Sequence, residues 1–228
     1  MRSYFKDSIY PQQGEELKME FEDPNRQSDV NEILAELYKS LISPEASIEE
    51  ITHMILAQAK RLTGSQHGYV SHIDRVTGDN IGYTLTEMMA GQCMLDKENQ
   101  RITFPIGKDG RYPGLWGHSL NTRQAFYTND PDKHPASNGV PRGHVPLERF
   151  LSLPVMLGDQ LVGQIALANP GRDYTDQDLK DVQRLGEFYA LSIRNKRANE
   201  TLKISEAKYR KLFEEAIDGI VLADAETG

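Results

Sequence analysis

The chain has 228 residues, of which 38% are hydrophobic and 26% charged, enough for one domain of about 150 residues with flanking helices. Its net charge of −8 argues against broad attraction to nucleic acid or anionic lipid. No apolar run is long enough to cross a bilayer, and the N-terminal segment lacks the apolar core of a secretory signal. The single cysteine, Cys93, excludes an intrachain disulfide and a paired-cysteine metal site. These features predict a cytoplasmic protein without membrane insertion.

Two helices are expected near the N-terminus. Residues 1–27 are polar and show no sustained period, so we expect a disordered leader or linker there. Apolar residues then recur at helical spacing over residues 28–41. A second helix is expected from Ser47, because Ser47 and Glu50 have the spacing of a capping box, and Gly64 suits its C-terminal end.

Strand patterns follow the second helix. Alternating or continuous apolar runs predict strands at residues 67–74, 81–87, 101–105, 125–128, 150–156 and 160–168. Between them, residues 107–149 are rich in Gly, Pro, His and Asn, with a short helix expected over 115–122 and then a loop of about 20 residues. Long loops inside compact domains are often functional.

A long helix is expected to close the domain. It begins at Thr175, where Thr175 and Asp178 form a capping-box analogue, and no proline interrupts it before Glu215. At about 1.5 Å per residue it is about 60 Å long, so it must project beyond its own domain. The order of elements predicts an α+β fold: one antiparallel sheet with helices packed against one face.

Several segments resemble known signalling domains. Residues 62–69, the hairpin 150–169 and the helix entry 174–179 are similar to GAF domains, and Pro141–Leu147 resembles a subgroup found in multi-domain sensor histidine kinases. Residues 205–220, with the string Ser-Glu-x-x-Tyr-Arg-x-Leu-Phe, resemble the start of a PAS domain. The expected organisation is a leader (1–27), a GAF sensory domain (28–197), and a signalling helix running into a truncated PAS start (198–228).

The resemblance implies a function. GAF domains bind a small molecule or prosthetic group in a pocket above the sheet, and the signal passes along the connecting helix to a downstream PAS, kinase or cyclase. No kinase nucleotide-binding or phospho-acceptor region is recognisable in the sequence, so the expected output lies outside it. The expected partners are a small-molecule ligand, a second copy of the chain, and a downstream PAS or kinase region.

Cys93 is the first candidate for ligand or cofactor binding. It is interpreted either as a thioether anchor for haem or bilin, or as a redox-sensing thiol, which needs thiolate character and access. The alternative is a small buried apolar residue. Met94 stands where a phytochrome-like cysteine is followed by His, which argues against bilin.

Three histidines lie in the glycine-rich segment. His118, His134 and His144 each carry an imidazole that is able to ligate haem iron, with His134 or His144 as the better candidates. The alternative for each is an ordinary hydrogen-bonding role, and their spacings fit no zinc pattern. The ligand is otherwise unknown from the sequence.

Aromatic residues share this segment. Tyr112, Trp116 and Phe126 are candidates for lining an apolar pocket that stacks on a planar ligand. Alternatively, they only cover the open face of the sheet.

The far part of the closing helix carries a sparse apolar stripe formed by Leu191, Ala198, Leu202 and Tyr209. One interpretation is a solvated helix stabilised by charge pairs. The other is a parallel dimeric signalling helix, because an apolar stripe beyond the domain core needs another partner.

Two further functions compete with the ligand sensor. An enzyme like the GAF-fold free methionine sulfoxide reductases would need a second thiol to resolve a sulfenic acid, and the sequence has one cysteine and no nucleophile–base arrangement. The other alternative is a structural dimerisation and relay domain that binds no ligand.

Overall fold

The computed structural model of the chain describes residues 46–83, 102–140 and 144–217, together with Ser28, residues 31–33 and Ala35. Within these residues, six strands form one antiparallel sheet in the order β3-β2-β1-β6-β5-β4. The strands are β1 (Ser65–Ile73), β2 (Asn80–Gly82), β3 (Ile102–Phe104), β4 (Phe126–Thr128), β5 (Phe150–Leu157) and β6 (Gln160–Pro170). Each predicted strand is present, and residues 84–87 of the second lie outside the described residues.

Helix α2 (Ile48–Thr63) begins and ends as its sequence predicts. The Ser47 N–H donates to Glu50 Oε2 at 2.7 Å, and the Glu50 N–H donates to Ser47 Oγ at 3.1 Å, which completes a capping box. Gly64 ends the helix in the left-handed region at φ 72°. Ser28, residues 31–33 and Ala35 are also helical, and Ile33 is buried in the core that α2 helps to form.

Helix α4 (Asp176–Ile217) is continuous over 42 residues. Its first turn is fixed by the predicted capping box, in which the Thr175 N–H donates to Asp178 Oδ2 at 2.9 Å and the Asp178 N–H donates to Thr175 Oγ1 at 3.3 Å. Arg172 donates to both oxygens of the buried Asp178 carboxylate, at 2.6 and 2.7 Å. The charge at this helix N-terminus is therefore paired as well as favourably placed in the helix dipole.

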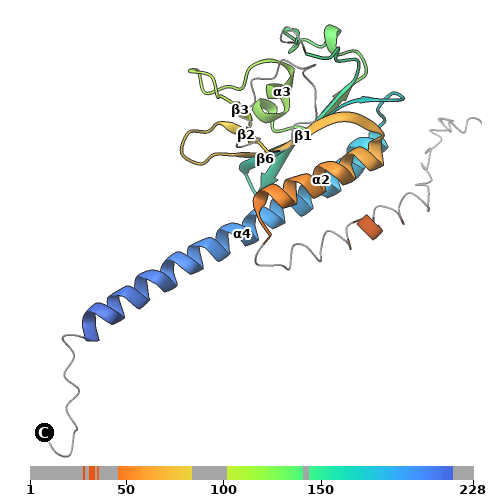
Figure 1. Cartoon of the computed structure of the whole chain (residues 1–228). Helices are drawn as coiled ribbons and strands as arrows, with labels where there is room; N and C mark the ends of the chain where they lie inside the picture. The colour runs from red at the N-terminus through yellow and green to blue at the C-terminus, as the bar shows by residue number, and fades with distance from the viewer. Residues whose placement is uncertain are drawn as a thin grey trace, which may run out of the picture.

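The sheet separates two layers (Figure 1). Helices α2 and α4 lie side by side on one face and bury the larger core against it, including Ile55, Leu151, Ile165 and Leu185. The prediction of helices packed on one face holds for these two. The short helix α3 (Gly114–Thr122) covers the opposite face, and a 3₁₀ turn (Pro131–Lys133) follows β4.

Helix α4 contacts the sheet closely at Gly163 of β6. A Cβ built there would lie 2.4 Å from the Ser71 carbonyl oxygen and 3.0 Å from the Tyr189 ring. Only glycine leaves room for this contact. The Tyr189 hydroxyl also donates to the Ser71 carbonyl oxygen at 3.2 Å, so α4 is bonded to β1 through a buried hydroxyl.

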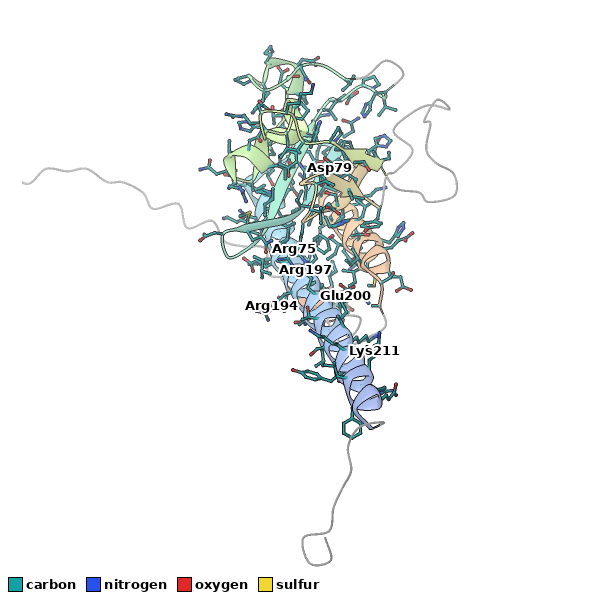
Figure 2. The ribbon with its side chains drawn as sticks, turned by 90° about the vertical axis from the view of Figure 1, so that its left-hand side faces the viewer. Arg75, Asp79, Arg194, Arg197, Glu200 and Lys211 are labelled. Carbon is teal, nitrogen blue, oxygen red and sulfur yellow. The ribbon has the colours of Figure 1, made fainter. Side chains whose placement is uncertain are left out.

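Helix α4 leaves the domain near Arg197. Figure 2 shows Arg75, from the turn after β1, beside Arg197 of α4, with Glu200 and Lys211 further along the helix. The pKa of Arg197 is lowered, mainly by its partial burial and then by the charge of Arg75. Beyond this point the described side chains are exposed, apart from the half-buried Ser205.

Candidate functional site

Helix α3 and the loop before it form one unit over the open face of the sheet. A Cβ at Gly117 would lie 2.3 Å from the Tyr112 carbonyl oxygen, so the helix and the loop touch backbone to backbone. The Asn121 side chain donates to the Tyr112 carbonyl oxygen at 2.7 Å and accepts from the Tyr112 N–H at 2.9 Å. These contacts fix the position of α3 against its own loop.

A cavity of about 570 Å³ lies between the C-terminal end of α3, the loop before it, and the ends of β1 and β6. This volume falls in the range of small-molecule sites. Part of its wall is apolar, from Ile73, Ile106, Leu120 and Leu161, and part is polar or charged, from Arg111, Asn121, Arg123, Asp159 and Gln160.

Two arginine residues line the cavity. Arg111 and Arg123 are exposed, and within the described residues neither is within ion-pair distance of a carboxylate. Arg123 Nη1 lies 3.9 Å from the sulfur of Met156. Arg123 also has φ 60°, a conformation that costs a residue with a Cβ about 1–2 kcal/mol. A long cationic side chain thus occupies a backbone position that favours glycine.

Tyr112 is the predicted aromatic residue that lines this cavity. Its hydroxyl donates to the Gly78 carbonyl oxygen at 2.7 Å, so it holds the loop before α3 to the turn between β1 and β2. Burial raises the pKa of Tyr112, partly offset by Arg123, so the phenol is neutral at physiological pH.

A buried polar network ties α3 to the sheet. At its centre is Gln164 of β6, which is fully buried. The Gln164 amide oxygen accepts from Tyr69 Oη and Asn80 Nδ2, both at 2.8 Å. Its amide nitrogen donates to Ser152 Oγ at 2.8 Å and to the Trp116 carbonyl oxygen at 2.7 Å. One side chain therefore bonds β1, β2, β5 and α3 together.

Aromatic rings pack against one another beside this network. The Trp116 ring centroid lies 5.2 Å from that of Phe104 and 5.8 Å from that of Tyr112, and Phe104 stacks on Tyr69 at 5.0 Å. Trp116 is half-buried in this layer and does not line the cavity.

His118, Phe126 and His134 form a separate aromatic cluster. Their ring centroids lie 4.9–5.1 Å apart, and Phe126 also contacts Phe150. None of these residues lines the cavity. The pKa of His134 is lowered, first by burial and then by the charge of His118. Adjacent imidazoles at this separation leave no space for a haem plane between them, so they do not fit as its two opposite axial ligands.

The ring hydrogen bonds of His134 and His144 differ. His134 Nδ1 accepts from the Ala136 N–H at 3.2 Å, so in the neutral ring the proton is on Nε2. His144 Nδ1 lies 2.7 Å from the Val145 carbonyl oxygen and must donate to it, which leaves the Nε2 lone pair open. His144 is therefore the histidine of the two whose state suits metal ligation.

The remaining predicted site residues are spread out. Cys93 lies outside the described residues. On α4, Leu191 is half-buried, whereas Ala198, Leu202 and Tyr209 are exposed. Over the part of the chain that the structure describes, no group of three or more potential metal ligands occurs, and no helix is long and apolar enough to cross a membrane.

Arg111, Arg123 and Gln164 belong to the candidate site but were not predicted from the sequence. The signal for Gln164 was readable, because a lone amide inside the apolar strand sequence Leu-Val-Gly-Gln-Ile-Ala-Leu must find buried partners. No local pattern marks the two arginines, since their proximity depends on the packing of α3 against its loop.

The arrangement is an α+β domain in which the sheet separates a cavity of small-molecule size from a projecting helix. Residues 45–194 match the family model described as "GAF domain", and the chain belongs to the GAF domain family. It is 28% identical over 171 residues to the methyl sulfide methyltransferase-associated sensor of Methanosarcina acetivorans. The match covers 75% of this chain and 16% of that relative, so the chain spans a small part of the relative's length.

Solved structures agree on the fold. The GAF domain of a phosphoenolpyruvate-protein phosphotransferase from Coxiella burnetii superposes with a TM-score of 0.61 at 15% identity, over 76% of this chain and 98% of that one. The free methionine-R-sulfoxide reductase from Neisseria meningitidis superposes with a TM-score of 0.57 at 13% identity, over 78% and 95%. At these identities the likeness shows the fold alone.

Proposed function

We propose that this GAF domain binds a small molecule in the cavity beside α3 and reports its occupancy through α4. The observation that carries the proposal is the position of the cavity: it opens on one face of the sheet, and α4 is docked on the other. A ligand that binds more tightly to one position of α4 than to another shifts the balance between them.

One route for this coupling runs through the turn between β1 and β2. Tyr112 lines the cavity and bonds to Gly78 in this turn. The same turn carries Arg75, whose charge acts on Arg197 where α4 leaves the domain (Figure 2). A ligand that moves Tyr112 would change the separation of these like charges.

A second route runs through β6. Gln164 bonds to the α3 backbone on one face of this strand, and the neighbouring Gly163 touches Tyr189 of α4 on the other. A shift of α3 would thus reach α4 through a single strand, with packed contacts at each step.

We further propose that α4 forms a parallel dimer. Positions spaced alternately four and three residues apart give a coiled-coil seam through Leu191, Asn195, Ala198, Leu202, Ser205, Tyr209 and Leu212. Leu202, Tyr209 and Leu212 on this seam are more than half exposed. A second copy would cover them. The proposed recipient of the signal is a PAS or histidine kinase region, supported by the PAS-like string at 205–220 and by likeness to a relative named as a sensor.

The test has two parts. A thermal-shift screen of small metabolites should identify ligands that raise Tm, and hydrogen exchange of α4 is then measured with and without the ligand. The proposal predicts changed protection in α4 as well as around the cavity. Arg75→Gln should reduce the change in α4, and the exposed Arg61→Gln on α2 is the control. A ligand that alters the cavity alone would contradict the relay.

A haem-type ligand is tested separately, because no imidazole lines the described cavity. Of His134 and His144, His144 fits better as an iron ligand through its open Nε2. Protein produced with a haem supply should show a Soret band that His144→Ala shifts or removes and that His134→Ala preserves. A band retained after acid–acetone extraction, and lost in Cys93→Ala, would assign a covalent link. Absence of a Soret band would contradict haem binding.

The competing function is a relay domain without ligand. It is supported by the rings of Trp116, Phe104 and Tyr69, which pack on one another on the α3 face of the sheet. A dimer that forms through α4, together with no compound that raises Tm, would favour it.

A further inference from the structure

We infer that the cavity beside α3 recognises a small organic carboxylate, with Arg111 and Arg123 holding the carboxylate and the apolar walls holding the rest of the molecule. This inference rests on the proposed function, because it names the class of ligand for the same cavity.

The positive charge in the cavity lining is the first reason to expect an anionic ligand. Two arginine residues line the same cavity, and within the described residues neither has a carboxylate partner. The planar fork of a guanidinium matches the two oxygens of a carboxylate. Two such forks in one cavity favour an anion whose oxygens both arginines can reach.

The backbone of Arg123 gives an independent reason. The helix-ending left-handed position at φ 60° is most readily occupied by glycine. Strain of this kind is found where a particular side chain is needed. Here it places Arg123 in the cavity lining, with its Nη1 3.9 Å from the sulfur of Met156.

The apolar walls decide between an inorganic anion and an organic one. Ile73, Ile106, Leu120 and Leu161 line the same cavity, whose volume is much larger than phosphate or sulfate needs. An apolar group of the ligand would remove these side chains from water, which favours binding. Asp159 adds one negative charge to the lining, which disfavours a second anionic group on the ligand.

The experiment compares benzoate with benzamide, which has the same shape and no charge. Binding to the full chain is followed by NMR, using backbone amides around the cavity and the Nε–H signals of Arg111 and Arg123. Benzoate should give saturable shifts at Gly110, Asn121 and Leu161, with an affinity about tenfold higher than benzamide. Inorganic phosphate should bind more weakly than benzoate.

Variants separate the arginines from the fold. Arg111→Gln and Arg123→Gln should each weaken benzoate binding about tenfold, and Arg123→Lys should restore part of it by restoring the charge. Arg194→Gln on α4 is the control and should leave the affinity unchanged. Asp159→Asn should tighten benzoate binding, because a repelling charge is removed.

Each contrary outcome has a distinct meaning. Equal binding of benzoate and benzamide, or unchanged benzoate affinity in both glutamine variants, overturns the carboxylate inference and leaves a ligand-binding cavity in place. Absence of binding by either probe in the tens of millimolar also overturns it. The proposed sensory function is then decided separately, by the ligand screen and the hydrogen exchange of α4.

Discussion

Gly163 of β6 lies in close contact with both β1 and α4. Gly163→Ala would place a methyl group 2.4 Å from the Ser71 carbonyl oxygen, and a neighbouring strand cannot move away without breaking its ladder. We expect a loss of about 1–3 kcal/mol in the free energy of unfolding, measured with urea. Gly171→Ala is the control, since nothing lies within 4 Å of its Cβ position. Equal stability of both variants would contradict the close contact.

The lowered pKa of His134 predicts that the stability of the domain depends on pH. Its pKa is lowered by burial and then by His118, and that of His67 is lowered by burial and then by Lys60 and His144. The unfolded chain therefore binds protons more readily than the folded one as the pH falls through about 6.5, and stability falls with it. Urea unfolding between about pH 7.5 and 5.5 should show this decrease. His134→Gln should flatten it, and the exposed His53→Gln should not; identical slopes would contradict the assignment.

At the level of elements, the network around Gln164 decides how firmly α3 is held. Gln164→Leu keeps the approximate volume but leaves the buried groups of Asn80 and Ser152 short of a partner. We expect a loss of about 2–4 kcal/mol and faster amide exchange in α3, measured by urea unfolding and hydrogen exchange. Gln183→Leu, on the exposed surface of α4, should change stability by less than about 0.5 kcal/mol. A tolerated Gln164→Leu would show that α3 is held by its aromatic contacts alone.

The helix ends and the central hairpin were predictable because their signals are local. Ser47 with Glu50, Thr175 with Asp178, and the turn at Gly158 each specify a boundary within four residues of chain. The placement of α3 was not predictable in this way. It depends on Gln164 and Asn121 meeting groups that are distant in the sequence or lie across a loop.

At the level of the whole molecule, the candidate site was likewise only partly predictable from the sequence. The aromatic and histidine content of residues 107–149 predicted which segment covers the open face, and Tyr112 does line the cavity. The structure divides the other candidates between a packed aromatic layer and a separate cluster around Phe126. Composition locates a segment, but the direction of each side chain is set by the packing of α3.

At this scale we predict that two copies of the chain assemble through α4. Leu202→Asp places a charge on the proposed seam of α4 and should shift the sedimentation equilibrium toward monomer without changing the Tm of the monomeric domain, because Leu202 is 57% exposed. Ala207→Asp adds the same charge on the opposite side of the helix and is the control. A wild-type chain that sediments as a monomer at all concentrations would contradict the dimer.

The uninterrupted course of α4 has a consequence for whatever follows it. Because a helix turns about 100° and advances about 1.5 Å per residue, the angular phase of a domain joined to the end of α4 would be set by the number of residues after Arg197. Seven added residues would move that domain outward by about 10.5 Å and rotate it by only about 20°. Four would rotate it by about 40°. If the signal is a change in helix phase, receptors with whole heptads inserted after Arg197 should keep their response, and those with partial heptads should be locked on or off.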